Sequence, residues 1–233
     1  MHLIDLSTRH LATETQRLLA TAEGLDDTAV RGPSLCQGWT RGHVLAHLAR
    51  NAEALARVCA VVLTGEPDTM YDSPQARDAD IEAGAGRPAT ALTADVRATA
   101  AALAPEIAKL GIEHVGTTVE RVPGGQLIPA ERVPYMRLRE VVWHHVDLDA
   151  GYGFEDTPDE LVRLFLEDTV SHLASSEGAP GISIRTDEGD AWTVGDGGTV
   201  VSGPRDGVLL WLARSRPDRL HEHPSLPSLP FGG

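Results

Sequence analysis

The sequence predicts an α+β protein, in which an N-terminal antiparallel four-helix bundle precedes a small C-terminal α+β domain. Through the first two thirds of the chain, hydrophobic residues recur at the three- and four-residue spacing of amphipathic helices. From Gly181 onward, short clusters of β-forming residues are separated by Gly and Asp. We therefore expect the bundle to occupy residues 1–153 and the α+β domain to occupy residues 154–233.

Four long amphipathic segments form the predicted bundle. Thr40 is a suitable cap for the second segment, and Gly24 and Gly65 are stop signals after the first and the second. The third segment is rich in alanine, which favours a helix. In order, the four segments are Leu3 to Glu23, Thr40 to Gly65, Thr90 to Leu110 and Val133 to Ala150. Their number and length favour an antiparallel bundle.

The α+β domain is predicted from two helices and three short strands. Thr157 is expected to cap a helix that runs from Pro158 to about Ser175. The strands, which we expect to be antiparallel, are Gly181 to Thr186, Ala191 to Val194 and Thr199 to Ser202. Arg205 to Ser215 then has helical spacing, and the Pro-rich tail from Pro224 to Pro230 is expected to be irregular.

The charge of the chain is strongly acidic. Its 34 acidic and 20 basic residues give a formal net charge of −14. Such a surface repels phosphate backbones and anionic membranes, so we expect neither nucleic acid nor a membrane as a partner. An anionic small-molecule substrate would need a local cluster of arginines.

The sequence also indicates a cellular compartment. Its start, Met1 to Leu6, lacks the basic and apolar regions of a secretory signal, and no apolar run approaches the length of a membrane span. We therefore expect a cytoplasmic protein. Cys36 and Cys59 are expected to be free thiols, because the cytoplasm is reducing. No feature signals an oligomer, and we expect a monomer.

Glu140 and His144 are four residues apart in the fourth predicted helix, so they share one face of it. An imidazole from the second helix, His47, would complete a set of two histidines and one carboxylate. Such a set leaves coordination positions free for water or substrate, as a reactive metal requires. The alternative is an exposed pair that contributes roughly 0.2 to 0.5 kcal/mol. The neighbouring valines at 141, 142 and 146 favour burial instead.

The segment from Met70 to Ile81 joins the second and third predicted helices and is too long for a simple turn of a bundle. Long connections are often functional, although this one could equally be extra surface structure. Its notable residue is Arg77. Without further information, Arg77 is best interpreted as a solvated charge beside Asp78 and Asp80.

Other residues near these motifs have plainer interpretations. His43 shares a face with His47 and is a lesser candidate for a ligand. His145 points about 100° away from His144 and is expected either behind the ligands or on the surface. No role is assigned to the polar neighbours Asn51 and Asp147. Core packing is the default for the aromatic residues Trp39 and Tyr71, and a structural thiol is the default for Cys36 and Cys59.

Three motifs stand out in the chain: GWTRGHVLAHLARNA at 38–52, MYDSPQAR at 70–77 and REVVWHHVDL at 139–148. They resemble motifs of the mycothiol-dependent maleylpyruvate isomerases, a family of the DinB-like metalloprotein superfamily. The resemblance covers most of the chain and implies a DinB-like bundle. Members of the family bind one zinc ion through a histidine of the second helix and a glutamate and a histidine of the fourth. These ligands correspond to His47, Glu140 and His144.

The resemblance implies a cis–trans isomerisation by reversible conjugate addition. A mycothiol thiolate adds to the cis double bond of maleylpyruvate, the resulting single bond rotates, and elimination gives fumarylpyruvate, in the gentisate route of aromatic catabolism. A metal would favour the thiolate at neutral pH, with mycothiol in an open coordination position. The implied cofactors are one Zn²⁺ per chain and mycothiol, and the implied substrate is a small dicarboxylate.

The carboxylates of that substrate call for cationic donors near the metal. Arg77 lies within the second motif and is the first candidate. In the family, an arginine that ends a pattern resembling Trp-Leu-x-Gly-Arg in the last helix is also linked to activity. Ser215 stands at that place here, so we expect Arg214 or Arg216 to face the site instead.

Two other functions are compatible with the motifs. A mycothiol S-transferase would share the metal and the thiol but would retain the adduct. A non-catalytic DinB-like metal-binding module would use its α+β domain to contact another protein. The ligand set also accepts iron, nickel or manganese, and the resemblance favours zinc.

Overall fold

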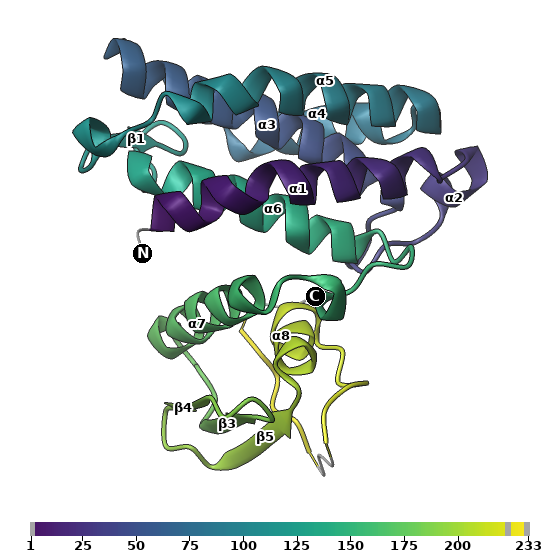
Figure 1. Cartoon of the computed structure of the whole chain (residues 1–233), viewed down its shortest axis with the longest axis vertical. Coiled ribbons are helices and arrows are strands. Elements are labelled where there is room, and N and C mark those ends of the chain that lie inside the picture. The colour runs from purple at the N-terminus through teal and green to yellow at the C-terminus, as the bar shows by residue number, and fades with distance from the viewer. Residues whose placement is uncertain (1–2, 222–224, 231–233) are drawn as a thin grey trace. The chain divides into compact units, whose positions relative to one another are not determined.

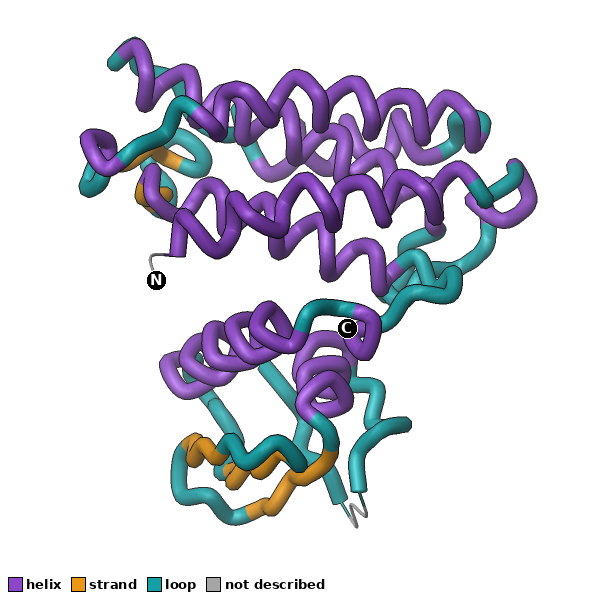
Figure 2. The backbone as a smooth tube through the Cα atoms, in the orientation of Figure 1, coloured by secondary structure: helices purple, strands orange, loops and turns teal. Residues whose placement is uncertain are grey.

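The computed structural model describes residues 3–221 and 225–230. The chain divides into two compact units, Met1–Gly151 and Tyr152–Gly233, whose elements are drawn in Figure 1. Helices dominate the first unit, and Figure 2 shows strands in both units. In the described part of the chain, no helix is long and apolar enough to cross a membrane.

Four helices of the first unit pack as the predicted bundle. They are α1 (Leu3–Glu23), α3 (Arg41–Thr64), α5 (Ala89–Ala108) and α6 (Val133–Asp147). Helices α1 and α3 each pack against both α5 and α6, and Figure 1 shows the four helices alongside one another. The prediction of an N-terminal four-helix bundle followed by a small α+β region is confirmed.

Helix α3 begins and ends where the sequence predicts. The Thr40 hydroxyl accepts a hydrogen bond of 3.3 Å from the His43 backbone N–H. At the other end, Gly65 has a φ of 74°, in the left-handed region that glycine adopts without strain. His47 is buried in the N-terminal part of this capped helix.

The connection from Met70 to Ile81 contains a helix that the sequence analysis did not predict, α4 (Pro74–Ala85). Ser73 caps it by accepting from the Ala76 N–H at 3.0 Å. It packs against α3, beside Gly42, where an added Cβ would lie 2.4 Å from the Ala85 carbonyl oxygen. The close approach places α4 over the N-terminal part of α3, with Arg77 beside His47.

A short hairpin joins α5 to α6 and was also not predicted. Its strands are β1 (Thr118–Glu120) and β2 (Leu127–Pro129), and the turns η1 (Ile112–His114) and η2 (Ala130–Arg132) flank it. The Met70 and Tyr71 N–H groups donate to the carbonyls of Glu120 and Arg121 at 3.0 and 2.9 Å. The hairpin therefore anchors the chain just before α4. A further short helix, α2 (Asp27–Arg31), follows α1.

The second unit combines two helices with a three-stranded sheet. Its elements are η3 (Phe154–Asp156), α7 (Asp159–Ser175), β3 (Ile182–Thr186), β4 (Ala191–Val194), β5 (Thr199–Gly203) and α8 (Arg205–Arg214). Helices α7 and α8 pack against each other and against the strands. Of the predicted tail, Pro224 lies outside the described residues, and 225–230 is irregular as expected.

Two predictions for this unit are wrong. The strand order is β4-β3-β5, with β3 and β4 antiparallel but β3 and β5 parallel. Each turn reverses the chain, so β5 runs in the direction of β3, and hydrophobic patterning does not reveal which strand it will join. Thr157 does not cap α7, whose cap position is Pro158. Its hydroxyl instead lies 3.0 Å from the Tyr152 hydroxyl.

Candidate metal centre

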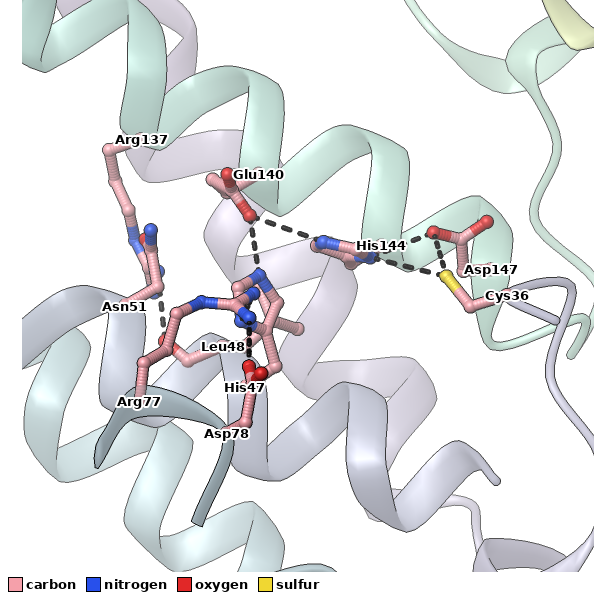
Figure 3. Close-up of polar contacts among 10 residues, drawn as sticks. All are labelled: Cys36, His47, Leu48, Asn51, Arg77, Asp78, Arg137, Glu140, His144 and Asp147. Carbon is pink, nitrogen blue, oxygen red and sulfur yellow. Dashed lines mark hydrogen bonds and ion pairs between the residues drawn. The ribbon is translucent and has the colours of Figure 1, made fainter. Parts of the chain in front are cut away.

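Three predicted ligands converge between α3 and α6. The His47 Nε2 lies 2.7 Å from the Glu140 Oε2, and the His144 Nε2 lies 3.2 Å from the same oxygen. One donor atom from each residue lies within 4.8 Å of the others. Figure 3 shows the two imidazoles directed at the carboxylate from different helices. Two nitrogens and one oxygen at this spacing fit a single divalent transition metal.

The three side chains set one another's protonation. Burial lowers the pKa of His47, and the nearby Glu140 only partly opposes this. Burial also disfavours the Glu140 carboxylate, but the attraction and hydrogen bonds of both imidazoles outweigh it and hold its pKa well below the usual value. Burial likewise opposes the charge of His144, yet hydrogen bonds with Asp147, Cys36 and Glu140 raise its pKa well above the usual value. The carboxylate form of Glu140 and the protonated form of His144 therefore stabilise each other.

A second carboxylate fixes the orientation of His144. Its Nδ1 donates to the Asp147 Oδ2 at 2.7 Å, and the Cys36 thiol donates to the same oxygen at 3.1 Å. The Leu35 N–H bonds the Asp147 carbonyl at 2.9 Å, which holds the cysteine loop against α6. With Nδ1 occupied, His144 presents Nε2 to Glu140. Cys36, His144 and Asp147 form a second close group of potential ligands.

Arg77 reaches the cluster from α4. Its Nη2 donates to the His47 Nδ1 at 3.3 Å, and its Nη1 donates to the Asp78 carboxylate at 2.7 Å. The guanidinium also lies 5.9 Å from the centroid of the Tyr71 ring. The interpretation of Arg77 as only a solvated loop charge is therefore wrong, because it contacts a member of the cluster.

Residues 11–149 match the family described as the mycothiol maleylpyruvate isomerase N-terminal domain. The chain belongs to this family. Two similar solved structures are crystal structures of the mycothiol-dependent maleylpyruvate isomerase and of a histidine-to-alanine mutant of it. Each is 26% identical, has a TM-score of 0.88, and covers 97% of this chain and 96% of its own. Among curated proteins, none matches this chain.

The maleylpyruvate isomerase family resemblance drawn from the three motifs is thereby confirmed, and the likeness extends through both units. The motifs fall at the places that build the cluster. The first contributes α3, the second leads into α4, and the third is the C-terminal half of α6. Their separation in sequence reflects the three elements that meet around His47.

Two further residues lie beside the cluster: Asp147, which the sequence analysis left without a role, and Cys36, which it expected to be a structural thiol. Asp147 follows His144 by three positions, a spacing that places both on one face of a helix and was a usable signal. Cys36 carried no such signal, because its contact with α6 spans more than a hundred residues. The structural role expected for Cys36 stays a prediction. Both cysteines are free, as predicted.

Trp39 packs against the hydrophobic core, as expected, and it also borders the two imidazoles. Its half-buried ring lies 5.5 Å from the His47 ring and 6.4 Å from the His144 ring, so it forms a wall of the site. Tyr71 is buried within the hydrophobic core, as expected. The aromatic wall beside the imidazoles is thus a single side chain from the loop before α3, within the described residues.

The other candidate residues are two histidines of the first unit and two arginines of the second. His43 contacts the Thr40 hydroxyl at 2.7 Å and the Glu82 carboxylate at 3.1 Å. His145 is buried, with Nε2 2.7 Å from the Thr21 hydroxyl, so it is not a surface residue. The last two candidates, Arg214 and Arg216, lie in the second unit on either side of Ser215, which ends α8 with a φ of 53°. Their approach to the metal centre stays a prediction.

Proposed function

We propose that this protein catalyses the mycothiol-dependent cis–trans isomerisation of maleylpyruvate to fumarylpyruvate, as a cytoplasmic, monomeric enzyme of aromatic catabolism. The observation that carries the proposal is the convergence of His47, Glu140 and His144 within a chain that resembles the mycothiol-dependent maleylpyruvate isomerase over nearly its whole length. The fold alone would not suffice, because folds host unrelated functions. The site adds the specific chemistry.

His47, Glu140 and His144 are proposed to hold one zinc ion per chain. Neutral imidazole nitrogen and carboxylate oxygen are suitable zinc ligands, and three protein ligands leave a position open. When bound, the metal would keep the mycothiol sulfur as a thiolate at neutral pH, ready for reversible addition to the cis double bond. Asp147 is proposed to fix the His144 ring for this purpose through the bond to Nδ1.

Arg77 is proposed to bind the anionic substrate. In the present arrangement the His47 Nδ1 accepts from Arg77, so the proton of this imidazole is on Nε2, which faces Glu140. A ligand imidazole must instead offer Nε2 without a proton, and its remaining proton then lies on Nδ1. Nδ1 can no longer accept from Arg77, which frees the guanidinium for a substrate carboxylate or for the enolate charge that develops after addition.

The second cationic donor is proposed to be Arg214 or Arg216. A dicarboxylate with a developing third charge needs more than one positive group, because the chain as a whole is acidic. Arg216 pairs with Asp218 at 3.1 Å and is exposed, whereas Arg214 is half-buried. Single substitutions of each by alanine, measured as KM for the dicarboxylate, distinguish the two.

The test is the absorbance change when zinc-loaded protein is mixed with maleylpyruvate, with and without mycothiol. Conversion to fumarylpyruvate should require both protein and mycothiol. Glu140→Gln should lose bound zinc and activity together, since an amide is a poor zinc ligand. A Glu140→Gln variant that kept zinc and full activity would contradict the proposed ligand set.

One observation favours a second candidate, a mycothiol S-transferase. Ser215 stands where the resemblance places an arginine, which removes one anion-binding group from the position expected for it. A transferase would use the same zinc and thiol but would retain the adduct. Zinc binding with no isomerisation, and consumption of mycothiol by another electrophile, would support it. Zinc binding with no thiol chemistry would instead indicate a non-catalytic module.

A further inference from the structure

A cavity of about 400 Å³ lies along the contact between α1 and α5, apart from the metal ligands. These two helices pack against each other and run side by side in Figure 1. The α5 wall consists largely of alanines, including Ala100, Ala101 and Ala104, and Leu11 and Leu19 contribute from α1. Small side chains on one helix leave space that the leucines of the other do not fill. The volume is within the range of sites for small ligands.

The charge of this cavity differs from that of the protein. The chain carries a net charge of −14, yet among the described residues only Arg97 and Arg137 are charged residues that line the cavity. Arg97 is exposed and pairs with Glu23. Arg137 comes from α6 and is buried. An apolar cavity with cationic groups and no lining carboxylate is electrostatically complementary to an anion.

Arg137 has an unsatisfied donor. Its Nη1 donates to the Leu48 carbonyl at 2.9 Å and to the Asn51 Oδ1 at 2.8 Å, contacts that Figure 3 shows. Its Nη2 is buried and, among the described residues, has no hydrogen-bond partner. The residue is only 2% exposed. A buried N–H group without an acceptor is unfavourable, so this arrangement leaves a donor for an oxygen that the chain does not supply.

The charge on Arg137 persists at neutral pH. Burial lowers its pKa to about 10, and the nearby Glu140 only partly offsets this. An anion beside the guanidinium would be favoured both by the charge and by the free Nη2 donor. A neutral molecule of the same shape would gain the apolar contacts alone.

We propose that this cavity binds a small amphipathic anion. Its hydrocarbon or aromatic body lies against the alanine and leucine walls, and its carboxylate or sulfonate accepts from Arg137. The ligand class is a monoanion with one apolar end, unlike the polar dicarboxylate proposed for the metal centre. This inference does not depend on the proposed function, because no metal ligand lines the cavity.

The test compares two fluorescent dyes with a shared aromatic framework, on the full-length protein. Anilinonaphthalene sulfonate carries an anionic group that N-phenylnaphthylamine lacks. The sulfonate should bind saturably, with one dye per chain and a dissociation constant about tenfold lower than that of the neutral dye, a difference of about 1.4 kcal/mol. Equal affinity for the two dyes would overturn the role of Arg137.

Cavity variants locate the bound dye. Ala104→Leu fills the space with a residue that favours helices, and it should weaken sulfonate binding about tenfold or more. Ala102→Leu is the matched control, because Ala102 is exposed on the same helix and does not line the cavity. Unchanged binding in Ala104→Leu would rule out this site. Arg137→Met should remove the preference for the anionic dye. If Arg137→Met does not fold, the comparison of Ala104→Leu with Ala102→Leu still tests the site.

Discussion

The His144 Nδ1 donates a hydrogen bond of 2.7 Å to the Asp147 Oδ2, and this carboxylate is only 1% exposed. The same oxygen accepts from the Cys36 thiol. A buried carboxylate of this kind both orients an imidazole and increases the electron density on its other nitrogen. His144 thereby presents Nε2 to the Glu140 side chain rather than turning away from it. This contact explains how Asp147, which is outside the predicted ligand set, contributes to the site.

Asp147→Asn should lower zinc affinity about 10- to 100-fold, because the amide no longer holds the charge and orientation of His144. The measurement is competition between the protein and a chelator of known affinity. Asp149→Asn is the matched control, since Asp149 lies two residues beyond and outside the ligand groups. Equal zinc affinities in the two variants would remove Asp147 from the site.

Zinc affinity should rise with pH through the neutral range. In the metal-free protein the pKa of His144 is raised, so the stability that its proton contributes is present below the unfolded pKa of about 6.5 and is lost as pH rises through the folded pKa. The free energy of metal binding depends on pH in the opposite direction, because the metal must displace that proton from Nε2. Release of one proton predicts about a tenfold increase in affinity per pH unit.

Chelator competition at several pH values checks this slope. In Asp147→Asn the hydrogen bond that raises the pKa of His144 is weakened, and the pH dependence should shift to lower pH. A zinc affinity that does not change across the neutral range would show that His144 is not protonated in the metal-free protein.

Arg77→Ala should raise KM for the dicarboxylate about tenfold or more, since a hydrogen bond from a charged group is lost. Zinc content should not change, because Arg77 contributes no ligand atom. Arg77→Lys should recover part of the affinity. The control is Arg87→Ala, an exposed arginine just beyond α4 that pairs with Asp95. If Arg77→Ala had the same KM as the Arg87→Ala control, Arg77 would be excluded from substrate binding.

Gly42→Ala should destabilise the bundle by about 1 to 3 kcal/mol, because the added Cβ would lie 2.4 Å from the Ala85 carbonyl oxygen. Helix α4 would have to move, and Arg77 with it. Gly86→Ala is the control, with a φ of −81° and nothing within 4 Å of an added Cβ. Thermal unfolding measures the difference. A Gly42→Ala variant as stable as Gly86→Ala would show that the α3–α4 contact readily adjusts.

Local sequence signals predicted the helices of the bundle and the ligand set. The hydrophobic spacing of α1, α3, α5 and α6 and the stop signal at Gly65 act within a few residues, so they can be read along the chain. The spacing of Glu140 and His144 is likewise local. The choice of His47 as their partner required the inference that the second and fourth helices face each other.

The sequence by itself thus determined which segments form the four helices of the bundle, which face of α6 carries the predicted ligands, and which family the motifs resemble. Only the tertiary structure decided that Cys36 contacts Asp147, that α4 carries Arg77 to His47, and that β5 joins β3 in parallel. These contacts link residues far apart in the chain, and their free energy depends on packing that no local pattern encodes. For the same reason, the sequence could not predict that the buried Nη2 of Arg137 has no hydrogen-bond partner among the described residues.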